Sequence, residues 1–137
     1  MNIHKTVRKD IIELLSGKVE GVKHFYNGNA FFSDVQEQLP AVSVAIASAT
    51  CDGVGIGAIE WNGTLDITIF VPMFESEDVL DELAEQINSL IRMGYGYKSV
   101  RQFRTGVGYD YTFDSEQHTW KCATLSYSID YGQQILS

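Results

Sequence analysis

Histidine and cysteine are the residue types best suited to act as a base, a nucleophile or a metal ligand, and the chain has few of them. Its three histidines, His4, His24 and His118, lie far apart in the sequence and show no local ligand or triad spacing. Cys51 has no nearby base that would activate its thiol, and an isolated cysteine is commonly a small buried hydrophobe. With two cysteines and no CxxC pair, neither a disulfide framework nor a zinc site is indicated. These residues therefore predict no catalytic, cofactor or metal site.

The glycine-rich stretch over 53–57 invites comparison with nucleotide-binding loops. A dinucleotide-binding loop follows a strand and opens a helix, whereas here a strand is expected after the glycines and no Gly-Lys-Ser/Thr sequence is present. Three glycines within five residues predict instead a flexible loop over 50–58, because glycine gives the backbone extra freedom. Such loops in small domains commonly bind a partner.

Four acidic or imidazole side chains near the C-terminal third, those of Asp110, Asp114, Glu116 and His118, are close enough in sequence to surround a hard cation. Their spacing matches no EF-hand loop. A solvated hairpin tip is the favoured interpretation of this segment.

Charge is distributed unevenly along the chain. There are 18 acidic and 10 basic residues, a net charge of −8, which argues against a phosphate-binding surface. Residues 75–85 contain six acids and no base, whereas 92–104 contain four bases and no acid. Two unlike faces suit a heterologous contact, in which one face of a subunit meets a different face of the next and the assembly closes into a ring. The alternative is a solvated helix face beside a scattered basic surface.

Tyrosines form a second pattern that fits an interface, since this residue is enriched there. Packing in the core or across strands explains the pattern equally well. The tyrosines concerned are Tyr95, Tyr97, Tyr109, Tyr111, Tyr127 and Tyr131.

The elements that must position these residues are those of one domain, because 137 residues match a typical domain length. Apolar periodicity predicts two helices and a set of strands, with most neighbouring strands joined by turns. This pattern is typical of an α+β domain over 1–137, with two helices packed on one face of a mostly antiparallel sheet. We expect helices over 3–15 and 76–93, a hairpin over 22–33, a central strand over 41–49, a long strand over 59–71, and strands over 109–113 and 123–131 joined by a turn at 114–118.

Membrane and secretory signals are not evident. No apolar run approaches the ~18 residues of a membrane-spanning helix, and residues 1–5 do not begin a secretory signal. The expected compartment is the reducing cytoplasm.

Several blocks along the chain, in their order and spacing, resemble the minor tail protein U family, the tail terminators of lambda-like long-tailed bacteriophages. The blocks are 25–28 (FYNG) with 30–32 (AFF), 39–44 (LPAVSV), 65–72 (LDITIFVP), the helix over 76–91, 108–111 (GYDY), Trp120 and 125–131 (LSYSIDY). No single block is diagnostic, and the likeness rests on their combination over nearly the whole chain.

The resemblance implies a structural virion assembly protein of a phage or prophage, without catalysis, cofactor or metal. It implies a homo-oligomer, a hexameric ring on the end of the tail tube, which stops tube polymerisation and presents the head-joining surface. The partners implied are the tail tube protein and a head–tail joining protein, with DNA passing through the lumen without specific binding. The implied location is the virion tail, and the host cytoplasm during assembly, where the free protein is a ring or a monomer.

Subunit contacts are expected between two regions of unlike charge. One combines the 51–60 loop with a basic zone, and the other is an acidic helix face. The first comprises Cys51, Asp52, Gly53, Gly55, Gly57 and Glu60 with the basic zone Lys98, Arg101 and Arg104; the second, the acidic helix face, comprises Asp78, Asp81, Glu82 and Glu85. Alternatives are a small ferredoxin-like ligand-binding domain, which would have a deep apolar pocket, and another phage neck or tail-tube protein.

Overall fold

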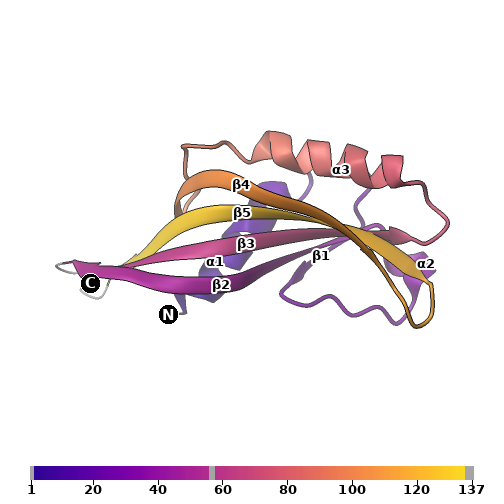
Figure 1. Ribbon diagram of the computed structural model, residues 1–137, viewed down its shortest axis with the longest axis horizontal. Helices are drawn as coiled ribbons and strands as arrows, with labels where there is room; N and C mark the ends of the chain where they lie inside the picture. Colours follow the sequence, from indigo (N-terminus) through magenta and orange to yellow (C-terminus); the bar gives the residue numbers. More distant parts are fainter. Residues whose placement is uncertain (1, 56–57, 135–137) are drawn as a thin grey trace.

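The computed structural model describes residues 2–55 and 58–134, which form a five-stranded sheet with three helices (Figure 1). The strands are β1 (His24–Asn27), β2 (Ala41–Gly55), β3 (Ala58–Pro72), β4 (Val100–Phe113) and β5 (Trp120–Gln134), in the spatial order β1-β2-β3-β5-β4. Every neighbouring pair is antiparallel except β1 and β2, which are parallel. The predicted α+β class and mostly antiparallel sheet are therefore confirmed. No helix in the described ranges combines the length and the apolar character that crossing a membrane requires.

Helix α1 (Ile3–Leu15) forms as the apolar periodicity predicts. Its buried residues recur on one stripe, and the side chain of Asn2 accepts a hydrogen bond from the Lys5 amide at 3.2 Å, which caps the first turn. The helix ends where Gly17 adopts a φ of 77°, a conformation that glycine reaches without steric cost.

The predicted hairpin over 22–33 is wrong. β1 pairs in parallel with the first residues of β2, from His24 opposite Ala41 to Asn27 opposite Val44. After Gly28 the chain leads to the short helix α2 (Val35–Gln38) instead of returning as a strand. The reason is Phe32, whose ring packs against the side chains of Tyr26 and Phe70. Its backbone does not form a strand that pairs with β1.

The loop predicted over 50–58 is also wrong over the described residues. β2 continues to Gly55 and β3 begins at Ala58, so the two strands form one long hairpin. Ladder hydrogen bonds use only backbone groups, and a register shift between Cys51 and Gly53 accommodates the glycines without ending the pairing. The part of the predicted loop at Ile56 and Gly57 lies outside the described residues.

β2 is a central strand only at its beginning, because the four residues of β1 cover Ala41–Val44 alone. These four positions are buried, and exposure rises after them. Beyond Val44, no strand of the described ranges pairs with the outer edge of β2, so this half of the hairpin is an edge. The expectation of a fully central strand is therefore correct only for its first half.

Helix α3 (Glu77–Leu90) is shorter than the predicted 76–93. Its buried stripe consists of Leu80, Leu83, Ala84 and Ile87, and Ser76 precedes it without a capping hydrogen bond from its side chain. After Leu90 the chain bends away from the helix axis toward β4, so the apolar residue Ile91 packs in the core without being helical.

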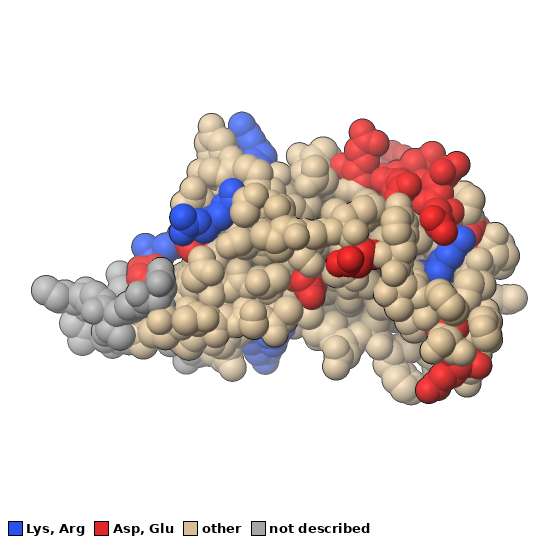
Figure 2. All heavy atoms as spheres, viewed as in Figure 1, with Lys and Arg blue, Asp and Glu red and all other residues tan. Residues whose placement is uncertain are grey.

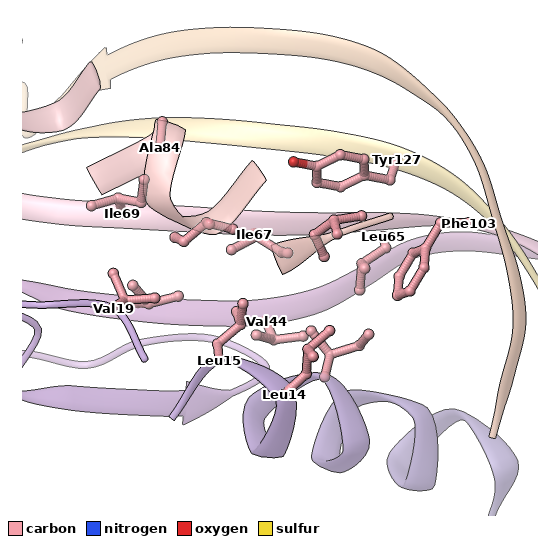
Figure 3. Packing of buried hydrophobic residues seen from close by; sticks show 14 of the residues in the cluster. Leu14, Leu15, Val19, Val44, Leu65, Ile67, Ile69, Ala84, Phe103 and Tyr127 are labelled. Atoms are coloured by element: carbon pink, nitrogen blue, oxygen red, sulfur yellow. The ribbon is translucent and has the colours of Figure 1, made fainter. Parts of the chain in front are cut away.

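One hydrophobic cluster unites α1, α3 and the strands (Figure 3). Leu65, Ile67, Ile69 and Val71 alternate along β3 and are fully buried, each contributing about 1.5–3 kcal/mol of hydrophobic stabilisation. Tyr127 is also buried, and its hydroxyl donates to Asn88 Oδ1 of α3 at 2.8 Å. Of the six tyrosines of the predicted pattern, Tyr127 and Tyr131 thus belong to the core, whereas the other four retain exposed surface.

Candidate functional site

The residues best suited to catalysis are not gathered in one place. His4 contacts Tyr131 Oη through Nδ1 at 2.8 Å, whereas His118 lies in the β4–β5 turn. Cys51 is exposed in β2 rather than buried; Cys122 is buried, and burial raises the pKa of its thiol. Among residues 2–55 and 58–134, no group of three or more His, Cys, Asp or Glu side chains is placed to hold a metal ion.

Asp114 organises the turn between β4 and β5. Its carboxylate accepts hydrogen bonds from the backbone amides of Glu116, Gln117 and Thr119 and from the Thr119 hydroxyl. The Thr119 hydroxyl and then the Gln117 amide are the main causes that lower the pKa of Asp114 to about 2. The carboxylate therefore ties the hairpin turn together, in line with the favoured interpretation of this segment.

The three side chains of the basic zone each form an ion pair within the chain. Lys98 Nζ lies 2.6 Å from Glu13 Oε1 of α1, and this hydrogen bond raises the pKa of the lysine. Arg104 Nη1 lies 3.1 Å from Asp130 Oδ2 of β5. These pairs are at the surface, where an ion pair contributes about 0–1 kcal/mol.

Arg101 and Glu60 join two predicted contact segments that are far apart in sequence. Arg101 Nη2 lies 2.8 Å from Glu60 Oε1, so the first residues of β4 meet the first residues of β3. The guanidinium passes so close to Gly132 that a Cβ at this position would lie 2.5 Å from Arg101 Nε. A larger side chain at 132 would therefore displace the arginine.

The remaining predicted contact residues of the hairpin lie along β2. Cys51 pairs with Trp61 in the register, and Gly53 pairs with Glu60, which places the hairpin segment beside Arg101. Asp52 and Gly55 belong to the same strand. Gly57 lies outside the described residues.

The acidic helix face has one member with a clear partner in the chain. Asp81 Oδ1 accepts hydrogen bonds from Tyr109 Oη at 2.6 Å and Tyr111 Oη at 2.5 Å. These bonds lower the pKa of Asp81, and the one to Asp81 is the main cause that raises the pKa of Tyr111. For Tyr109, burial and then the bond to Asp81 raise the phenol pKa. Asp81 thus ties α3 to β4, a contact that the sequence analysis missed.

Asp78, Glu82 and Glu85 are exposed on α3 and complete the acidic helix face. Figure 2 shows acidic side chains gathered over α3, while Lys and Arg side chains lie mainly toward the other end of the sheet. The structure therefore brings the 51–60 hairpin and Arg101 together, and it keeps the acidic helix face separate from them.

Three exposed phenylalanines form a surface that the sequence analysis did not single out, which we call the aromatic end. Phe31 and Phe74 are each 81% exposed and Phe113 is 54% exposed. They come from the segment before α2, the β3–α3 connection and the end of β4. The available sequence signal is that Phe74 lies in the short connection between a predicted strand and a predicted helix, where an apolar residue is not needed for the core.

The hollows at the aromatic end are open at the surface. One of about 800 Å³ is lined by residues that include Phe31, Phe70 and Phe113. Because two of these side chains are themselves largely exposed, the hollow has the character of a surface groove. A ligand-binding domain would instead enclose its ligand in a deep apolar pocket.

Comparisons with known proteins point to a phage tail. The sequence matches the family described as phage minor tail protein U over residues 2–131. A search of curated proteins gives no match. Among solved structures, a chain from the virion of a native gene transfer agent particle superposes with a TM-score of 0.62, covering 93% of this chain and 95% of that chain at 6% identity. At this identity the superposition shows that the two chains share a fold.

The family match covers nearly all of the sequence, and it includes every described strand up to Tyr131. The protein therefore belongs to the phage minor tail protein U family, a family of structural tail proteins.

Proposed function

We propose that this tail protein is a tail terminator, which forms a ring on the end of the tail tube, stops tube polymerisation and provides the head-joining surface. Family membership supports a role in the tail. The observation that carries the ring is the separation of two unlike surfaces. The hairpin segment with the basic zone occupies one region, and the acidic helix face occupies another.

Unlike surfaces favour a head-to-tail contact. A two-fold symmetric contact centred on either surface alone would place that surface against its own copy and bring like charges together, which costs free energy. When the basic zone of one subunit contacts the acidic helix face of the next, one end of the growing assembly keeps an unpaired basic zone and the other end keeps an unpaired acidic helix face. Such a contact closes into a ring when the rotation between neighbours divides a full turn. The resemblance to tail terminators implies six subunits.

The ion pairs inside the subunit are compatible with this contact. Arg101 and Arg104 pair with Glu60 and Asp130 at the surface, where exchanging one carboxylate partner for another has a small free-energy cost. On the acidic helix face, Asp81 already holds two phenol hydroxyls. Asp78, Glu82 and Glu85 are therefore the residues we propose as partners of the basic zone.

The lumen of the ring must let DNA pass without holding it, and the polar face of the sheet suits this task. Along β3 and β5 this face carries hydroxyls and carboxylates, including Asp66, which accepts from the Ser126 hydroxyl at 2.8 Å. In the view of Figure 2 the centre of the sheet shows acidic side chains and no Lys or Arg. Such a surface repels phosphates instead of binding them.

The test is a mass measurement by light scattering on a sizing column, over a concentration series with and without magnesium, with negative-stain images of any large species. Closed rings of one size support the terminator, whereas open filaments indicate a tube subunit. If the protein is a monomer under every condition, purified tail tubes are added as a template. Tubes that keep growing in its presence would refute the proposed function.

A further inference from the structure

The aromatic end is a continuous surface, although its three phenylalanines come from separate segments. The hollow beside Phe31 and Phe113 shares Val35, Gln36 and Thr119 with a second hollow of about 460 Å³, which is lined by Phe74. Figure 1 shows α2, the β4–β5 turn and the β3–α3 connection at the same end of the molecule. Exposed phenylalanines gathered at one end of a small protein indicate an interaction site.

The segment that carries Phe31 is held rigidly by one side chain. Gln38 Oε1 accepts from the amides of Ser33 and Asp34 at 2.8 and 2.7 Å. Its Nε2 donates to Tyr26 Oη at 2.8 Å and to the carbonyl of Phe31 at 3.3 Å. The exposed ring is therefore presented on an ordered backbone.

The layer under the aromatic end is a row of packed rings. Phe32 lies edge-on to Phe70 with 4.9 Å between ring centroids, and Phe70 lies edge-on to Trp120 at 5.2 Å. The neighbouring β4–β5 turn is fixed by Asp114, as described above. An exposed apolar surface on a rigid support is preorganised, which lowers the ordering cost of binding.

Acidic side chains dominate the surroundings of the aromatic end. Asp34, Asp114 and Glu116 line the hollow beside Phe31, and Glu77 and Lys121 line a third hollow beside Phe113. A partner that matches this surface presents apolar pockets framed by lysine or arginine.

We infer that the aromatic end is the surface through which the protein docks on the end of the tail tube, against a tube-protein surface with apolar pockets and a basic rim. This inference rests on the proposed function, because a terminator must contact the tube through a surface other than the two that join it to its ring neighbours. The basic zone and the acidic helix face supply those two. The aromatic end contains neither of them, and its exposed phenylalanine rings suit a stable contact with a different protein.

The experiment measures binding of the full chain to purified tail tubes by co-sedimentation, with electron microscopy of the tube ends. The test variants replace Phe31, Phe74 and Phe113 by serine, singly and together. Val107→Ser is the matched control, because Val107 is an apolar residue of β4 that is 55% exposed. Each variant is also measured by light scattering for self-assembly and by circular dichroism for folding.

The triple variant should fold, self-assemble as the wild type does and bind tubes roughly 100-fold more weakly, with each single variant contributing about tenfold or less. Raising the salt concentration should weaken wild-type binding, because the acidic rim contributes through screened charges. Val107→Ser should bind normally.

Unchanged tube binding by the triple variant would overturn the inference. Loss of self-assembly with tube binding retained would also overturn it, because the surface would then contact a second copy of the chain. Failure of the wild type to bind tubes would refute the proposed function itself, and so differs from failure of the variants alone.

Discussion

The region around the basic zone and the aromatic end expose opposite kinds of side chain. In the first, Lys98, Arg101 and Arg104 project from the surface and each pairs with a carboxylate of the same chain. In the second, Phe31 and Phe74 leave most of their surface in water, while Phe32 beside them packs into a row of rings. Exposed ion pairs can change partners at little cost, whereas exposed phenylalanines gain free energy only when a partner covers them. The basic zone is therefore suited to contacts that exchange partners, and the aromatic end is suited to docking.

The largest effect on stability should come from the layer under the aromatic end. Phe32→Ala removes a half-buried ring that contacts Tyr26 and Phe70, and we expect it to lower the free energy of unfolding by about 2 kcal/mol. Phe31→Ala is the control, because its ring is exposed and its removal should change stability by less than about 0.5 kcal/mol. Urea unfolding curves measure both, and equal losses would contradict the distinction between supporting and docking rings.

A smaller effect should follow from loosening the support of Phe31. Gln38→Ala removes hydrogen bonds to the amides of Ser33 and Asp34, and we expect a loss of about 1 kcal/mol. Amide hydrogen exchange at these two residues should accelerate, while exchange in α1 should not. Gln36→Ala in the same short helix serves as the control, since the exposed side chain of Gln36 holds no part of this segment together. Unchanged exchange at Ser33 would show that the segment is ordered by other contacts.

The regular elements could be predicted from sequence because periodic burial leaves a periodic pattern. The stripe of α1 and the alternation of β3 from Leu65 to Val71 each report directly which face meets the core. The errors arose where local turn signals competed with distant contacts. Asn27–Gly28 predicted a hairpin, but Phe32 packs on Phe70 in a different strand. The glycines after Cys51 predicted a loop, but pairing with β3 continues through them.

The candidate surfaces were predictable only in part, because contacts between distant residues leave no local pattern. The charge runs indicated two unlike regions, and the Arg101–Glu60 pair does join two segments that were predicted to act together. No spacing in the sequence relates Asp81 to Tyr109 and Tyr111, which meet because α3 lies beside β4. The aromatic end was missed for the same reason, since Phe31, Phe74 and Phe113 come from three separate segments.

The next prediction concerns acid stability at the β4–β5 turn. Hydrogen bonds lower the pKa of Asp114 from its ordinary 3.8 to about 2 in the folded protein. The unfolded chain therefore binds more protons than the folded chain between these values, so stability from this group is present above about pH 4 and is lost as the pH falls toward 2. Asp114→Asn should show a smaller fall of Tm across this window. Glu116→Gln, in the same turn, is the control. If Asp114→Asn and the wild type show the same fall of Tm between about pH 4 and about pH 2, Asp114 does not cause the loss of stability in acid.

The smallest effect on stability, with the clearest effect on assembly, should come from charge reversal in the basic zone. Arg101→Glu should change the free energy of unfolding by less than about 1 kcal/mol, because its pair with Glu60 is exposed. The same change should weaken ring formation in light scattering, since it places like charge against the acidic helix face of the next subunit. Lys18→Glu makes the same change of charge at an exposed position outside the basic zone and should leave assembly intact. Glu82→Lys should also weaken the ring by itself, and combining it with Arg101→Glu should restore assembly if the two residues meet across the contact. Assembly that is unaffected by either reversal would place the ring contact elsewhere on the subunit, and the basic zone would then be a surface whose charges are satisfied within the chain.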